Sequence, residues 1–148
     1  NYLENNYSFS EFHMVGISGG GWTSTVYPAL DSRILKSFSV AGSLPLSLRN
    51  TVNDVGDYEQ FHPKLYSTTN YFEIYVLSSV GKDRGFYQIF NTNDPCCFSG
   101  ETFKVYHEPL KKIISQFNSG DFDIFIDDTH DQHIISPFST NLIIDKLS

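Results

Sequence analysis

The chain has 148 residues, the length of one domain, and its 40% hydrophobic and 16% aromatic content indicates a packed protein rather than a disordered one. Its formal net charge of −7 disfavours nucleic acid, anionic membrane surfaces and polyanionic substrates as partners. No apolar run approaches the length of a membrane span, and the stretch at 74–80 is far too short.

The first third of the chain predicts a strand, a helix and a second strand. Residues 1–6 have the pattern of a helix end, so we expect the chain to be the C-terminal part of a larger domain. A continuous apolar run predicts a strand at 12–17, and the stretch at 35–40 is predicted as a second parallel strand. The helix between them completes a right-handed βαβ unit. That helix is indicated by apolar residues at helical spacing, with Pro28 expected to kink or shorten it: Trp22, Val26, Ala29, Leu30 and Ile34.

The middle of the chain is less regular. Residues 43–70 are mostly turn-forming, with a short helix predicted at 58–66, and we expect this excursion to lie over the active site like a lid. Residues 71–80 are apolar at nearly every position and fit either a strand or a helix. Aromatic and β-branched residues predict a strand at 86–90, which leads into a dense turn signal.

The last third predicts a helix, a strand and a closing helix. Helical spacing of apolar residues indicates a helix at 102–117, and the next strand is expected at 122–126. A loop rich in aspartate and histidine follows at 127–133. Ser136 and Pro137 then predict the start of a helix through Leu147, with serine as N-cap and proline in the first helical position.

A serine between two glycines is the most informative motif. Gly16, Ser18 and Gly20 form the pattern G-x-S-x-G, which at a strand-to-helix turn exposes a nucleophilic hydroxyl at the sheet edge. A strained backbone at the serine leaves little room for side chains two residues away, so glycine is expected at both flanks. The N–H of Gly19 would then face a developing oxyanion. A plain turn serine, or a phosphate site at the helix start, fits the same motif.

The rest of the chain supplies partners for Ser18 in the required order. A serine nucleophile needs a base and a group that orients the base, and both belong on loops at the carboxyl ends of later strands. Asp94 follows the strand at 86–90, and Asp83 is the alternative acid if 71–80 is a strand. His133 is the preferred base because it lies just before a capped helix, and His130 is the alternative.

These motifs resemble the α/β-hydrolase superfamily. The residues concerned are the elbow at 16–22, the A-L-D-x-R-I segment at 29–34, the strand end at 39–42 and the acid loop at 89–95. The stretch at 71–80 is similar to the helix that precedes the acid strand in dienelactone-hydrolase-like and acetyl-esterase-like members, which favours a helix there. The acid loop departs from the pattern, since it lacks a glycine before Asp94 and carries two cysteines after it.

The resemblance implies an α/β fold, with a mostly parallel sheet flanked by helices and without its N-terminal strands in this chain. It further implies a serine hydrolase that cleaves carboxylic esters or related acyl bonds of small molecules and needs neither metal nor organic cofactor. A peptidase or an acyltransferase would use the same triad, and a hydrolase-fold binding protein without activity is the alternative from another class. Compartment and oligomeric state stay open.

The remaining cysteines and histidines have simpler expected roles. Cys96 and Cys97 are adjacent, and neighbouring cysteines seldom bridge, so we expect neither a disulfide nor, with only two ligands, a zinc site. His13 and His107 are expected to be structural. A weaker alternative is a metal site in the late loop, formed by Asp127, Asp128, His130 and His133.

Overall fold

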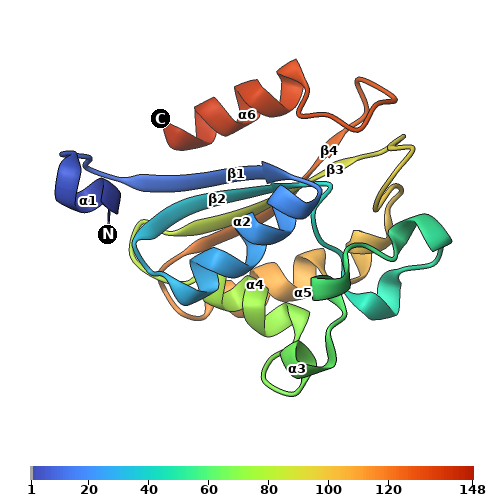
Figure 1. Ribbon diagram of the computed structural model, residues 1–148, viewed down its shortest axis with the longest axis horizontal. Helices are drawn as coiled ribbons and strands as arrows, with labels where there is room; N and C mark the ends of the chain where they lie inside the picture. The colour runs from blue at the N-terminus through green and yellow to red at the C-terminus, as the bar shows by residue number, and fades with distance from the viewer. Residues whose placement is uncertain (1) are drawn as a thin grey trace.

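A four-stranded parallel sheet is the centre of the computed structural model, which describes residues 2–148 without the side chain of Asn53 (Figure 1). The strands lie in sequence order, and each is parallel to its neighbours. This confirms the predicted α/β class. The strands are β1 (Phe12–Ile17), β2 (Ile34–Val40), β3 (Gly85–Asn91) and β4 (Asp121–Asp127).

Helices cover both faces of the sheet. On one face, α2 (Gly19–Leu30), α4 (Tyr71–Ser79) and α5 (His107–Ser115) pack over a core that includes Phe86 and Phe122 (Figure 1). On the other face, α6 (Pro137–Leu147) contributes Ile143 to a smaller core with Phe38 and Ile89. Alternate residues of β3 therefore serve different cores, which explains why apolar residues occupy neighbouring positions of this strand in the sequence.

The sheet register brings the functional loops to one edge. Ile17 pairs with Val40 and Val40 pairs with Ile89, while Asn91 pairs with Asp127. All four strands thus end together, and the loops that follow them lie along the carboxyl edge, where open α/β sheets bind ligands.

The excursion between β2 and α4 is built from short helical turns. They are η1 (Leu46–Leu48), η2 (Val52–Asp54), η3 (Tyr58–Gln60) and α3 (Pro63–Tyr66). Arg49 holds the segment together, because its guanidinium donates to Leu44 O and Gln60 Oε1, both at 2.8 Å, and to Val55 O. Asp54 ties the segment to the acid loop by accepting from Phe98 N at 2.7 Å.

Some predicted helices end differently from expectation. The helix expected at 102–117 is divided into η4 (Thr102–Val105) and α5, so that Pro109 falls in the first turn of α5. Backbone N–H groups in a first turn have no intrahelical acceptor, so the N–H that proline lacks is not needed there. The helix expected at 58–66 is likewise divided, because the residue before Pro63 is extended. Ile34, assigned to the first helix, instead begins β2.

The ambiguous stretch at 71–80 forms α4, as the resemblance implied. Asn70 caps it by accepting from the N–H groups of Phe72 and Glu73, and the Glu73 carboxylate accepts from Asn70 N in return. Near the N-terminus, α1 (Tyr2–Asn6) forms one short turn. Within residues 2–148, no helix combines the length and the apolar character that crossing a membrane requires.

Candidate active site

Ser18 occupies the sharp turn between β1 and α2. Its backbone has φ 56° and ψ −125°, a conformation that non-glycine residues rarely adopt. The turn is fixed on both sides, since Ser18 N donates to Val40 O at 3.0 Å and Ser18 O accepts from Trp22 N at 2.9 Å. The strained serine therefore stands at the carboxyl edge of the sheet, directly before the helix N-terminus.

The two glycines that flank Ser18 are not equivalent. A Cβ atom on Gly16 would lie 2.1 Å from Gly20 O, so no side chain fits there. A Cβ on Gly20 would meet nothing within 4 Å. The expectation that crowding requires glycine at both positions is therefore correct for Gly16 and wrong for Gly20, because the turn closes over the strand side only.

Close backbone packing fixes the start of α2 against β2. A Cβ on Gly42 would lie 2.4 Å from the Cα of Gly21, so the helix rests directly on the end of the strand. Gly19 is the first residue of α2, and its N–H has no acceptor within the helix. This N–H and the positive end of the helix dipole lie next to the Ser18 hydroxyl.

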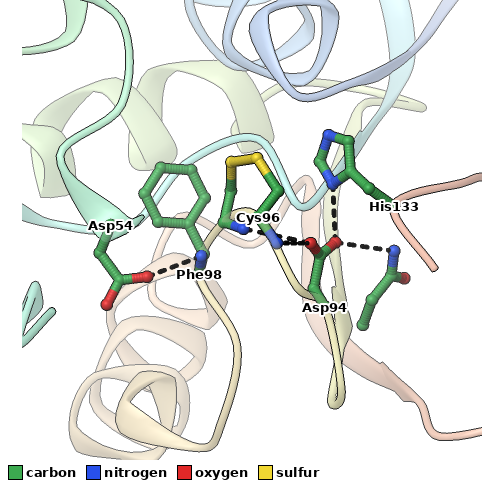
Figure 2. Close-up of a disulfide and its surroundings, with 7 residues drawn as sticks. Asp54, Asp94, Cys96, Phe98 and His133 are labelled. Carbon is green, nitrogen blue, oxygen red and sulfur yellow. Dashed lines mark hydrogen bonds and ion pairs between the residues drawn. A yellow bond between two sulfur atoms is a disulfide. The ribbon is translucent and has the colours of Figure 1, made fainter. Parts of the chain in front are cut away.

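Asp94 and His133 are joined by a hydrogen bond of 2.7 Å between Asp94 Oδ2 and His133 Nδ1 (Figure 2). The Asp94 side chain is fully buried, and its Oδ1 accepts from the N–H groups of Cys96 and Cys97 at 2.8 and 3.1 Å. These bonds compensate the desolvation of the carboxylate and hold it in one orientation. Because the carboxylate is fixed, its bond to Nδ1 also holds the His133 imidazole in one orientation.

Asn91 connects the acid loop to the histidine loop. Its amide nitrogen donates to Asp94 Oδ2 at 3.3 Å and to Ile134 O at 3.1 Å, from a fully buried position at the end of β3. Asn91 is not among the site residues predicted from the sequence. The sequence feature that could have indicated it is a polar side chain at the carboxyl end of a mostly apolar strand, because a buried amide there needs hydrogen-bond partners.

His133 has one ring nitrogen that is not used by the loop. Within residues 2–148, Nε2 of His133 is shielded from solvent and has no hydrogen-bond partner, while Nδ1 is held by Asp94. A donor held at Nδ1 fixes the tautomer in which Nε2 carries a free lone pair. The ring is therefore arranged to accept a proton, or to bind a cation, at Nε2.

Ser18 opens into a cavity of about 300 Å³. Its walls come from three parts of the chain: the elbow, the acid loop and the excursion at 43–70. Asp57 lies close to the start of α2, with Oδ2 3.0 Å from the position of a Cβ on Gly19. The remaining wall residues are Val52, Val55, Gly56, Gln60, Cys96, Cys97 and Phe98.

Cys96 and Cys97 form a disulfide, which corrects the expectation that they would stay unbridged (Figure 2). The physical reason lies in the acid loop. Because Asp94 Oδ1 accepts from both backbone N–H groups, the two residues are held in one tight turn, and their sulfurs come together. A ring nitrogen of His133 and the two sulfurs lie within 4.8 Å of one another, so a third potential ligand atom lies near the two cysteines.

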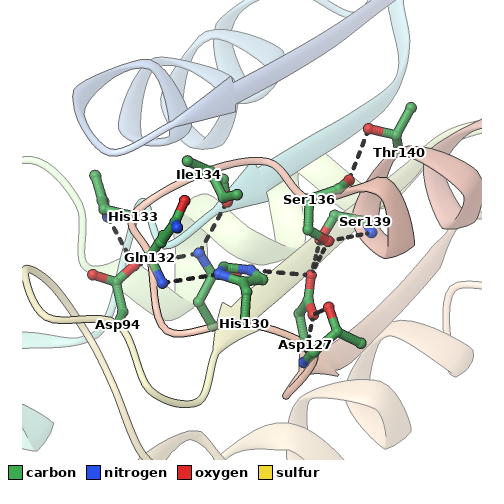
Figure 3. A network of polar contacts seen from close by, with 11 residues as sticks. Asp94, Asp127, His130, Gln132, His133, Ile134, Ser136, Ser139 and Thr140 are labelled. Carbon is green, nitrogen blue, oxygen red and sulfur yellow. Dashed lines mark hydrogen bonds and ion pairs between the residues drawn. The ribbon is translucent and has the colours of Figure 1, made fainter.

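His130 lies on the same loop as His133 but belongs to a different cluster (Figure 3). Its Nε2 is 3.4 Å from Asp127 Oδ2, and its Nδ1 accepts from Gln132 N. Asp127 also accepts from Ser136, Ser139 and Thr129, the last two at 2.7 and 2.6 Å. Burial raises the pKa of Asp127, but these hydroxyl groups outweigh it and lower that pKa to about 2.

The other candidates lie apart from the Asp94–His133 pair. Asp83 is in the turn before β3, which places it at the opposite edge of the sheet from the loops that carry Ser18 and Asp94. Over residues 2–148, the late-loop set with Asp128 is not among the groups whose ligand atoms come close enough for a metal. His107 bonds Asp123 at 2.7 Å, and His13 accepts from Lys36 N, so both have structural partners.

Similarity to known proteins is visible only in the fold. No protein-family model matches the sequence, and no curated protein is similar to it. A protein from Klebsiella pneumoniae assigned as a dienelactone hydrolase shares the fold with a TM-score of 0.57 at 12% identity; the match covers 99% of this chain and 54% of that one. An acetyl xylan esterase from Thermoanaerobacterium gives 0.49 at 19% identity, covering 91% and 44%.

The first of these similarities confirms the α/β-hydrolase fold that the sequence motifs implied. The chain spans about half the length of the solved structures that it resembles. At such low identity the likeness concerns the arrangement of the sheet and its helices, so the chemistry has to be argued from the residues of this chain.

Proposed function

We propose that the protein is a serine hydrolase that cleaves carboxylic esters or related acyl bonds. The observation that carries the proposal is the Asp94–His133 hydrogen bond, which leaves His133 Nε2 without a partner among residues 2–148. The ring lies near Cys96 and Cys97, which line the cavity of Ser18. A strained serine, an oriented imidazole and a buried carboxylate are the three parts of an acyl-transfer triad.

In the proposed reaction the Ser18 hydroxyl attacks the acyl carbonyl, and His133 Nε2 accepts its proton. Asp94 holds the ring and stabilises the imidazolium, while the N–H of Gly19 donates to the oxyanion. The imidazolium returns the proton to the leaving alcohol, which departs from an acyl-Ser18 intermediate. Water, deprotonated by His133, then releases the acid and restores Ser18.

The cavity favours small and uncharged acyl groups. Its volume of about 300 Å³ is at the lower end of ligand pockets in proteins. Asp57 lies in its wall, and the chain carries a net charge of −7, so anionic acyl groups would be repelled. A short, neutral ester is therefore the substrate class that the site fits.

Replacement of Ser18 tests the proposal. Ser18→Ala is expected to lower kcat/KM for a short-chain aryl ester by about 10⁴-fold or more, because the nucleophile is removed. Ser10→Ala, at an exposed position before β1, serves as the matched control and is expected to keep the wild-type rate. Equal rates for Ser18→Ala and wild type would rule out the proposal.

A fluorophosphonate probe separates hydrolysis from the related activities. Labelling of Ser18 together with ester turnover supports the esterase. Labelling without ester turnover would indicate a peptidase or an acyltransferase with the same triad, because only an activated serine reacts. A folded protein that remains unlabelled would indicate a binding protein without the activity.

A further inference from the structure

The Cys96–Cys97 disulfide forms part of the cavity wall beside Ser18, and the proposed reaction does not use it. Cys96 is exposed and Cys97 is half-buried, so a thiol or phosphine reductant can reach the bond. The two sulfurs and a ring nitrogen of His133 lie within 4.8 Å of one another (Figure 2). The wall therefore carries two soft donor atoms next to the imidazole that the reaction needs.

We propose that reduction of this disulfide creates an inhibitory site for a thiophilic divalent cation, with Zn²⁺ as the best fit. The ligands are the thiolates of Cys96 and Cys97 and the Nε2 atom of His133. Two thiolates and one imidazole match the donors that Zn²⁺ prefers, and three protein ligands leave a fourth position open toward the cavity.

The distances suit such a site. Zn–S and Zn–N bonds of about 2.3 and 2.0 Å in a tetrahedron separate the ligand atoms by about 3.5–3.8 Å. The two sulfurs and a ring nitrogen of His133 already lie within 4.8 Å of one another, and opening the disulfide lets the sulfurs move apart while the imidazole stays in place. No rearrangement of the strands is needed.

Asp94 supplies the outer shell that a metal-binding histidine requires. Its Oδ2 accepts from His133 Nδ1, which leaves Nε2 as the coordinating atom, an arrangement common at zinc sites. Its Oδ1 accepts from the backbone N–H groups of Cys96 and Cys97, so the same carboxylate positions all three ligands. Within residues 2–148, Nε2 of His133 has no hydrogen-bond partner, so its lone pair is not committed to another group.

Both steps of the proposed switch conserve atoms and electrons. Reduction by a dithiol breaks one S–S bond and forms two protein thiols, while the dithiol is oxidised to its own disulfide. Zn²⁺ then replaces the two thiol protons, which are released to solvent. In the disulfide form neither sulfur can become a thiolate, so the site exists only in the reduced protein.

Inhibition follows because the cation occupies the atom that would accept the Ser18 proton. This consequence rests on the proposed function, whereas binding of the metal does not. The two can therefore be measured separately.

The test compares oxidised protein with protein reduced by a phosphine, using the full chain in both cases. Zn²⁺ affinity is measured by competition with a chromogenic chelator, and Co²⁺ is added separately to detect a thiolate-to-metal charge-transfer band. We expect the reduced protein to bind one Zn²⁺ at least 100-fold more tightly than the oxidised protein and to show the cobalt band. Equal Zn²⁺ affinity in the two redox states would overturn the proposal.

Variants identify the ligands. Cys97→Ser and His133→Gln are expected to lose the cobalt band and the tight binding, whereas His130→Gln, on the same loop, is expected to retain both. Loss in His130→Gln to the same extent as in His133→Gln would place the metal elsewhere and contradict the assignment. The comparison of redox states needs no substitution, so a variant that fails to fold does not affect it.

The effect on activity is then followed with the aryl ester. Zn²⁺ is expected to inhibit the reduced protein in proportion to occupancy, with recovery on chelation, and to leave the oxidised protein unaffected. Metal binding without any ester turnover in either state would retain the metal site and reject the proposed function. Zn²⁺ inhibition of Cys97→Ser with the wild-type dependence would reject the inhibitory role.

Discussion

His133 and His130 lie three positions apart on one loop, yet different carboxylates hold them. His133 bonds Asp94, next to the wall of the Ser18 cavity, while His130 lies against Asp127 and the start of α6. The sequence places both after the same strand. Their side-chain partners, which come from the ends of β3 and β4, distinguish them.

Substitution of the two histidines is expected to give different results. His133→Asn removes the proposed base, so kcat/KM for the aryl ester should fall by about 10³-fold or more. His130→Asn should change the rate by less than about 10-fold, because it alters only a supporting contact. Steady-state assays of both variants provide the measurement, and a larger loss for His130→Asn would transfer the role of base to that residue.

At the scale of the element, the turn between β1 and α2 leaves different amounts of space for a side chain at Gly16 and at Gly20. Gly16 lies under the carbonyl of Gly20, and Gly20 itself faces open space. Sequence motifs treat the pair as equivalent, and only the direction in which the turn closes separates them.

Alanine substitution at Gly16 and at Gly20 is expected to have different effects on the free energy of unfolding. Gly16→Ala forces a Cβ to 2.1 Å from a backbone oxygen, which should lower the free energy of unfolding by about 2 kcal/mol or more. Gly20→Ala lies in a helix with free space and should be neutral or stabilising by up to about 1 kcal/mol. Urea denaturation of both variants measures this, and equal losses would contradict the packing described for the turn.

The sequence predicts the strands well because buried parallel strands are continuous apolar runs. All four predicted strands fall within those observed, and the order of Ser18, Asp94 and His133 follows from the loops after them. The excursion at 43–70 could not be derived in the same way. Its shape depends on Arg49 and Asp54, whose partners are carbonyl and amide groups distant in sequence.

The disulfide was missed for a similar reason. The general geometry of adjacent cysteines argues against a bridge, whereas in the acid loop the two residues are bridged and both of their backbone N–H groups donate to Asp94. Asn91 was missed because a buried amide has no periodic signal, although it joins the two loops that carry Asp94 and His133.

For the whole molecule, the Asp127 cluster connects the sheet to α6. Asp127 ends β4, and the hydroxyl groups of Ser136 and Ser139 at the start of α6 donate to it. In the described part of the chain, α6 supplies the helical cover on its face of the sheet (Figure 1). The Asp127 carboxylate therefore links that cover to the sheet.

Low pH is therefore expected to destabilise the folded protein by protonating Asp127. Its pKa is about 2 in the folded protein and near its ordinary value of about 3.9 in the unfolded chain. A lowered folded pKa stabilises the protein fully above pH 4, and the stabilisation is lost as pH falls through the folded value. Stability measured by urea should thus decline between pH 4 and pH 2.

Ser139→Ala should weaken this dependence. It removes one donor to Asp127, so we expect a loss of about 1 kcal/mol at pH 7 and a shallower decline in acid. Thr140→Ala is the matched control, because its hydroxyl donates to Ser136 O instead of to Asp127. An identical acid profile for Ser139→Ala and wild type would show that Asp127 does not contribute to the decline.

The contact between Gly21 and Gly42 has a consequence for protein engineering. The helix and the strand meet backbone to backbone, so any side chain at either position would push the start of α2, and with it Ser18, away from the sheet. Directed evolution of new substrate ranges should therefore leave this pair untouched and randomise Val52 and Val55, which line the cavity. Libraries divided in this way would keep the catalytic framework constant while the recognition surface varies.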